Sequence, residues 1–160
     1  MKKLFLCILL VVCLLPNIFA SDVTFFGVVD GTTKKDAVKI LKQQKVKTTE
    51  VGSMLKVNLK EYLGLKTISI GLNFTKDKEP KMKGYAISFD EDNTLEDISL
   101  AILPILEEYG IDFLKEPIVT SNETYLVSGK SEDGDVIVQF YYESYKGHIF
   151  YDLLVLKTTY

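Results

Sequence analysis

The sequence predicts an α+β fold in which one antiparallel sheet packs on two helices, as tandem helix-plus-three-strand repeats. Three observations lead to this prediction. Two apolar stripes of helical period each follow a threonine cap, several segments alternate apolar and polar residues, and glycine turns separate those segments. We expect one domain over residues 21–160, with repeats at 23–90 and 91–160.

A short β-rich run at 23–29 is expected to open the first repeat. The first helix follows, because Thr33 precedes Asp36 by the spacing of a side-chain cap and an apolar stripe comes next. This helix should end near Lys45. The segment 48–66 has an irregular pattern, so we expect a link there that contains one strand.

Two alternating segments complete the first repeat. Ile68, Ile70, Leu72 and Phe74 alternate with polar or small residues, as in a half-buried strand. The segment 83–89 alternates in the same way after a polar loop. We therefore expect the two segments to pair as antiparallel strands.

The second repeat is expected to begin with a helix that Thr94 and Asp97 cap and Gly110 ends. Pro104 lies inside its pattern, which predicts a kink rather than two helices. After a link, three strands should follow, with turns at Asp133-Gly134 and Lys146-Gly147. One core should contain residues from both repeats, namely Ile70, Phe74, Ile87, Ile102 and Leu106.

Residues 1–20 have the pattern of an export signal. Lys2 and Lys3 precede an apolar run that is shorter than the roughly 20 residues of a membrane-spanning helix, and Ala20 offers a small residue for cleavage. We expect an exported product, periplasmic or secreted. A lipoprotein signal ending at Cys13 is the alternative, which the bulky residue before that cysteine disfavours.

Composition narrows the expected partners. The chain has 22 acidic residues against 19 basic ones, all lysine, and a net charge of −3. Without the planar fork of arginine and without a basic strip, nucleic acid is not an expected partner. Cys7 and Cys13 both lie in the signal, so we expect no disulfide or cysteine metal site in the mature chain, and no cofactor.

Few residues offer catalytic chemistry. His148 is the one histidine of the sequence, so a histidine-dependent triad would need it, and we expect an ordinary strand residue there instead. The acidic run 90–93 could attract calcium, but acids at a helix start are better explained by the helix dipole. Carboxylate pairs for hydrolysis cannot be recognised without geometry.

The segment 27–41 resembles the opening of small exported bacterial proteins, including beta-lactamase-inhibitory-protein-like folds and the small outer-membrane assembly lipoproteins related to them. The tandem layout of helix and strands is also similar to the inhibitor. This resemblance implies a protein that binds other proteins and catalyses nothing. The chain departs from the pattern in having no mature cysteine and one helix per repeat where the inhibitor has two, so no functional residue is carried over.

The last predicted strand, 148–156, is apolar on both faces, and so it needs two covers. We expect the links 48–66 and 111–123 to provide the second cover, with an external partner as the alternative. If a partner binds there, aromatic residues are the expected contacts, because tyrosine recurs at interfaces. The candidate binding residues are Tyr141, Tyr145, Phe150 and Tyr151.

These observations predict an exported bacterial binding protein without catalytic activity, whose partner is another exported or envelope protein. The alternatives are a cell-envelope hydrolase that uses carboxylates and a structural envelope protein.

Overall fold

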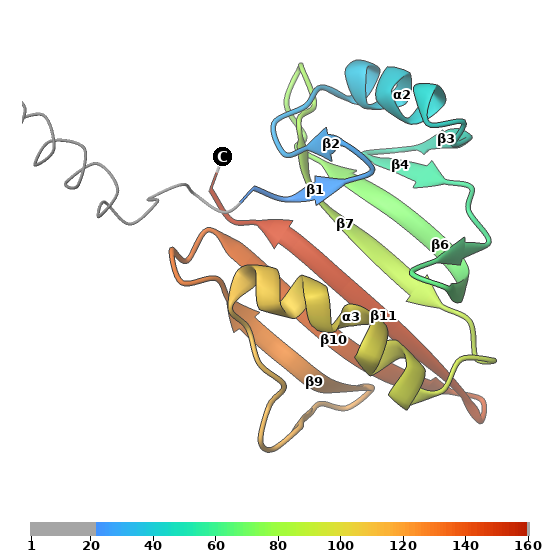
Figure 1. Ribbon diagram of the computed structural model, residues 1–160, viewed down its shortest axis with the longest axis vertical. Coiled ribbons are helices and arrows are strands. Elements are labelled where there is room, and N and C mark those ends of the chain that lie inside the picture. Colours follow the sequence, from blue (N-terminus) through green and yellow to red (C-terminus); the bar gives the residue numbers. More distant parts are fainter. Residues whose placement is uncertain (1–21, 160) are drawn as a thin grey trace, which may run out of the picture.

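The computed structural model describes residues 22–159, and one long antiparallel sheet dominates it (Figure 1). The strand order is β3-β4-β6-β7-β11-β10-β9-β8, and β5 pairs with β6 beside this path. The helices are α2 (Lys34–Gln43) and α3 (Leu95–Tyr109). The strands are β1 (Thr24–Phe25), β2 (Val28–Val29), β3 (Thr48–Val51), β4 (Met54–Val57), β5 (Glu61–Tyr62), β6 (Leu65–Phe74), β7 (Met82–Phe89), β8 (Ile118–Val119), β9 (Glu123–Lys130), β10 (Val136–Tyr145) and β11 (His148–Lys157).

The expected fold class, a sheet packed on two helices in helix-plus-three-strand repeats, is wrong. Of the described residues, 46% lie in strands and only 18% in helices, which is a sheet-rich fold. Five strands follow α2 and four follow α3 in the described chain, because the presumed links also form strands. Gly52, at φ 58°, allows the tight turn that joins β3 to β4, and this hairpin extends the sheet.

Both helices begin as the threonine caps predict. Thr33 Oγ1 accepts a hydrogen bond from Asp36 N at 3.2 Å, and Thr94 Oγ1 accepts one from Asp97 N at 3.1 Å. Gly110 ends α3 in the left-handed conformation, and Pro104 lies within one helix, not between two. Within residues 22–159, neither helix has the length and apolar character to cross a membrane.

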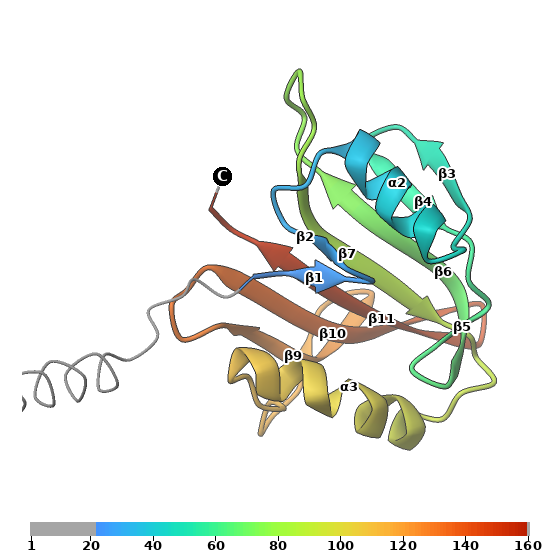
Figure 2. The same ribbon diagram turned by 45° about the horizontal axis from the view of Figure 1, so that its top comes forward.

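The N-terminal run folds differently from the expected single strand. It forms a hairpin of β1 and β2, because Phe26 and Gly27 both adopt positive φ and make a tight turn. This hairpin lies between the two helices on the same side of the sheet (Figure 2). Phe25 and Val28 are buried there, so the hairpin fills the space that the two short helices leave open.

One apolar core lies under the helices and the hairpin. The five residues expected in it are all buried in a single cluster, so that prediction is confirmed. Ile68 differs from the expected alternation: it sits at a β-bulge in β6 and is 48% exposed. A bulge adds a residue that has no partner, and so the alternation shifts at that point.

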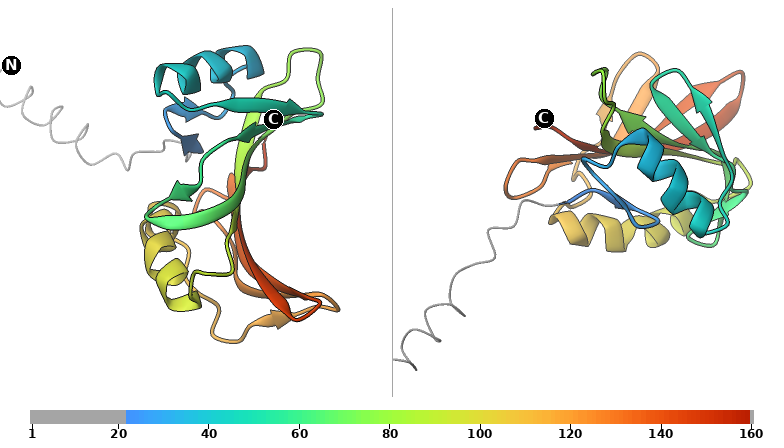
Figure 3. Two further views of the ribbon diagram at one scale, coloured as in Figure 1. Left: turned by 90° about the vertical axis from the view of Figure 1, so that its right-hand side faces the viewer. Right: turned by 90° about the horizontal axis from the view of Figure 1, so that it is seen from above.

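The sheet has one covered face and one open face. Seen edge-on, α2, α3 and the β1–β2 hairpin lie on one side, here called the inner face, and no other described element lies on the opposite, outer face (Figure 3). The presumed links do not cover it. Leu55 and Ile111 from these segments are buried in the core cluster of the inner face, so the expected internal cover is wrong.

Candidate functional site

The outer face of the C-terminal half of the sheet carries a row of aromatic and polar side chains. Tyr141 on β10 pairs with Asp152 on β11 and with Tyr125 on β9, and Asp152 pairs with Ser88 on β7. The rings of Tyr125 and Tyr141 are 5.0 Å apart between centroids. Ser88 Oγ donates a hydrogen bond to Asp152 Oδ1 at 2.5 Å, so four strands contribute to one continuous row.

The structure places three of the four predicted binding residues on this outer face. Tyr141, Tyr145 and Phe150 share it, because they alternate with the buried inner residues of β10 and β11. Tyr151 lies on the inner face, packed against the core and stacked on Phe140 at 6.2 Å. Tyr145 is 60% exposed at the hairpin end, with Lys146 Nζ 5.0 Å from its ring centroid.

Aliphatic side chains extend the aromatic row along β10 and β11. Ile137 pairs with Leu156, and Leu154 lies between Leu156 and Asp152 on the same face. These side chains are partly exposed because no described element covers them. We call this surface the outer patch; it consists of Tyr125, Ile137, Tyr141, Phe150, Leu154 and Leu156.

Three carboxylates border the outer patch. Glu123 on β9 is directly opposite Glu143 on β10, and Asp152 lies on the neighbouring strand β11. Burial raises the pKa of Asp152, the hydrogen bond from Ser88 lowers it, and the charges of Glu143 and Glu123 raise it further. We call Glu123, Glu143 and Asp152 the acidic trio.

The same surroundings raise the pKa values of Tyr141 and Tyr125. Burial, followed by the charges of Asp152 and Glu123, raises the pKa of Tyr141 to about 12. The Tyr125 hydroxyl donates to Glu123 Oε2 at 2.5 Å, and this hydrogen bond raises the pKa of Tyr125. Both phenols therefore stay neutral at physiological pH and can act as hydrogen-bond donors.

Sequence reasoning missed the acidic trio, Tyr125 and Ser88 as members of one site. Glu143 could have been found, because it lies two residues from Tyr141 and so shares its face. The members of the site on β9 could not have been found from the sequence. A bulge between the partners of Phe140 and Tyr141 shifts the alternation of β9, so its outward residues do not follow from the pattern.

The one histidine of the sequence has a carboxylate partner. His148 Nδ1 lies 2.6 Å from Glu91 Oε2, and the pair borders a groove of about 380 Å³. Thr94 lines the same groove, but its hydroxyl donates to Asp97 as part of the helix cap. The Thr94 hydroxyl is therefore engaged in the helix cap and is not available to the pair as a nucleophile.

The acidic residues of the run 90–93 form ion pairs and hydrogen bonds with neighbouring residues. Asp92 pairs with Lys66 at 2.5 Å, Asp90 accepts a hydrogen bond from Asp92 N, and Glu91 pairs with His148. No group of three histidine, cysteine or acidic side chains in residues 22–159 is arranged to hold a metal ion.

A larger groove of about 750 Å³ lies beside the start of α2. Lysines and acids both line it, including Lys34, Lys39, Asp36 and Glu50. Lys34 Nζ donates to the Gly52 carbonyl at 2.8 Å, and Lys39 pairs with Asp36 at 2.8 Å. Four lysines and three acids line the groove, and Lys34 and Lys39 pair with acids within it, so its charges are nearly balanced and do not select a ligand.

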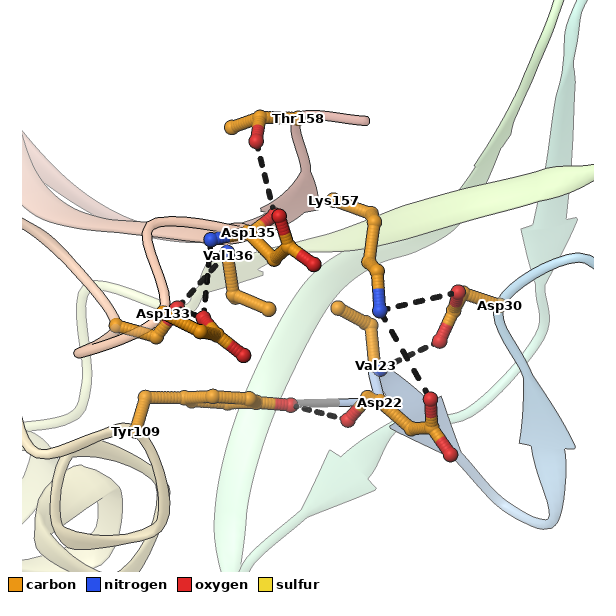
Figure 4. Close-up of polar contacts among 10 residues, drawn as sticks. Asp22, Val23, Asp30, Tyr109, Asp133, Asp135, Val136, Lys157 and Thr158 are labelled. Carbon is orange, nitrogen blue, oxygen red and sulfur yellow. Dashed lines mark hydrogen bonds and ion pairs between the residues drawn. The ribbon is translucent and has the colours of Figure 1, made fainter. Parts of the chain in front are cut away.

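A second polar cluster joins the ends of the described chain (Figure 4). The Lys157 side chain is only 8% exposed, and its Nζ lies 3.6 Å from Asp30 and 3.8 Å from Asp22. Tyr109 donates to the Asp22 carbonyl at 3.1 Å, and Val23 N donates to Asp30 at 2.8 Å. These contacts hold the β1–β2 hairpin against α3 and β11, so we assign the cluster a role in stabilising the fold.

Comparisons with models of known families, with curated proteins and with solved structures gave no match for this chain. The resemblance to beta-lactamase-inhibitory-protein-like and assembly-lipoprotein-like proteins therefore stays a prediction.

Proposed function

We propose that this chain is an exported binding protein without catalytic activity, and that the outer patch receives another exported or envelope protein. The observation that carries the proposal is the uncovered face of β10 and β11, which presents aromatic and aliphatic side chains side by side. Contiguous exposed apolar surface of this kind marks protein interaction sites.

The composition of the outer patch supports a protein partner. Tyrosine and phenylalanine supply large contact area at low conformational cost, and they are enriched at the centres of interfaces. Tyr141 and Phe150 lie on neighbouring strands of the same face, and Leu154 continues the surface beyond them. A partner would bury this row against hydrogen-bonded strands, whose paired backbone has little conformational freedom left to lose on binding.

The expected export signal, residues 1–20, lies outside the described residues. We propose that cleavage after Ala20 yields a chain beginning at Ser21. The intact mass of the secreted protein checks this, and a chain beginning at a diacylated Cys13 would contradict it. Screening the purified protein for hydrolase activity addresses the alternative of a cell-envelope enzyme.

A double substitution tests the binding surface. Tyr141→Ser with Phe150→Ser should abolish partner capture from envelope extract while leaving the thermal unfolding midpoint nearly unchanged, because partly exposed rings contribute little to the monomer. The control is Leu100→Ser with Leu103→Ser, which removes exposed apolar residues from α3, on the other side of the sheet. Capture that survives the first pair of substitutions, or global unfolding caused by them, would contradict the proposal.

A further inference from the structure

The acidic trio has no counter-charge within the described chain. Glu123 accepts a hydrogen bond from Tyr125 and Asp152 accepts one from Ser88, and both donors are neutral hydroxyls. No lysine in residues 22–159 lies within ion-pair distance of Glu123, Glu143 or Asp152. Three like charges thus share one sheet face without neutralisation.

This arrangement costs the folded chain stability. Glu123 and Glu143 are directly opposite each other on paired strands, and like charges in that position are destabilising. All three carboxylates are partly buried, which weakens the screening that water supplies to fully exposed charges. A bound positive charge would relieve both the repulsion and the loss of hydration.

Other acids of the described chain contrast with the trio. Asp92 pairs with Lys66, Asp36 pairs with Lys39, and Asp30 pairs with Lys157. Lysines are plentiful in the sequence, yet no described lysine of the outer face pairs with the trio. Lys130 is opposite Ile137, near the other end of β10, and Lys146 Nζ lies 5.0 Å from the ring centroid of Tyr145 and makes no ion pair with Glu143. The negative charge of the trio is therefore local and uncompensated.

We propose that the outer patch binds an arginine- or lysine-bearing segment of a partner protein, with a cationic side chain placed among the rings of Tyr125 and Tyr141 and the acidic trio. This inference rests on the proposed binding role of the outer patch and names the chemistry of the partner.

Charge complementarity selects this occupant. A cation over a tyrosine ring gains cation–π attraction, and carboxylates beside the ring add charge-assisted hydrogen bonds. Guanidinium suits the site better than ammonium, since it stacks on aromatic rings and donates to carboxylates in a planar fork. The aliphatic stem of the side chain would contact Phe150 or Leu154, which flank Asp152 on β11. An anionic segment would be repelled.

Peptide binding to the purified protein tests this inference. The probe is a fluorescent hexa-arginine peptide at low ionic strength, and the matched control peptide is hexa-citrulline, which has nearly the same shape without the charge. We expect the citrulline peptide to bind about tenfold more weakly or worse. Equal binding of the two peptides would overturn the inference.

Matched variants locate the binding. Glu123→Gln, Glu143→Gln and Asp152→Asn together should weaken hexa-arginine binding about tenfold or more, because amides keep the shape and remove the charge. The control combines Asp77→Asn, Glu107→Gln and Glu132→Gln, exposed acids elsewhere with the same change in net charge, and should stay within about twofold. Equal losses in both variants would show non-specific attraction and overturn the inference.

Two further results separate the inference from the proposed function. If hexa-arginine does not bind but capture still depends on Tyr141 and Phe150, the cationic partner is wrong and the binding surface stands. If hexa-arginine binds through the trio but capture ignores those rings, the proposed function is wrong. If spermidine competes as well as the peptide, the site recognises a small polyamine and not a protein segment, and the inference is overturned. Should the triple variant fail to fold, Glu143→Gln alone serves as the test, with an expected loss of about threefold.

Discussion

Phe140 and Tyr141 are neighbours in β10, yet they belong to opposite faces of one sheet. Phe140 is fully buried under the helices, whereas Tyr141 lies on the open face beside Asp152. Both faces of this half of the sheet carry large apolar side chains, but only the inner one is covered by the described chain. Apolar character alone therefore does not mark the core of this protein; a covering element is also needed.

Alanine substitutions at these two neighbours should give the largest difference in the free energy of unfolding. Phe140→Ala should lower the free energy of unfolding by about 3 to 5 kcal/mol, because it leaves a cavity in a packed core. Tyr141→Ala should cost about 1 kcal/mol or less, the usual range for a cross-strand pair contact. Urea unfolding of the two variants measures both values. Similar losses would mean that the outer face is covered after all.

The packing of α3 against the inner face can be tested by substitutions in the helix. Ile102 on α3 is fully buried, and Ile102→Ala should cost about 2 to 5 kcal/mol. Leu103, the next residue, is 38% exposed and provides the matched control, since Leu103→Ala should change stability far less. Thermal unfolding distinguishes the two. An unchanged midpoint for Ile102→Ala would show that α3 does not cover the sheet.

The smallest expected effect concerns Asp152 on the open face. Tyr141 and Glu143 face it from β10, Glu123 and Tyr125 from β9, and Ser88 from β7. Burial of the carboxyl, and after it the charges of Glu143 and Glu123, raise its pKa in the folded chain, whereas the hydrogen bond from Ser88 lowers it.

A raised pKa means that the folded chain binds this proton more tightly than the unfolded chain. Stability therefore falls as pH rises from the ordinary carboxyl value of 3.8 through the raised one, and the loss persists above that window. Asp152→Asn should remove this loss and stabilise the protein near neutral pH by less than about 1 kcal/mol, since solvent still screens the site. The two proteins should agree near pH 3. A variant that is less stable at neutral pH would contradict this expectation.

Local signals in the sequence predicted local structure well. The caps at Thr33 and Thr94 and the end of α3 at Gly110 were found because each depends on residues within one or two turns. The β3–β4 hairpin was predicted only in part, because one strand was expected within 48–66 and β3 was missed. β3 has four residues, none of them buried, and lies at the edge of the sheet, so its sequence lacks the apolar alternation that identifies a strand.

The candidate site was predictable only in part, because it depends on which strands pair and in which register. Alternation along β10 and β11 places Tyr141 and Phe150 outward, and this follows from sequence once the inner face is known. The approach of Glu123 to Glu143 depends on the register of β9 and its bulge. Register is set by the packing of the whole sheet, and no local pattern reports it.

The contact between Lys157 and Asp22 has a consequence for the order in which the chain can fold. Asp22 is the first described residue and Lys157 lies at the end of the last described strand, so segments far apart in the sequence meet in one cluster. The β1–β2 hairpin cannot obtain its final contacts until β11 has been synthesised, and pairing β7 with β11 closes a long loop whose entropy must be overcome first. The N-terminal half of the described chain therefore cannot complete its fold by itself during synthesis, because the strand that supplies its last contacts comes from the other half.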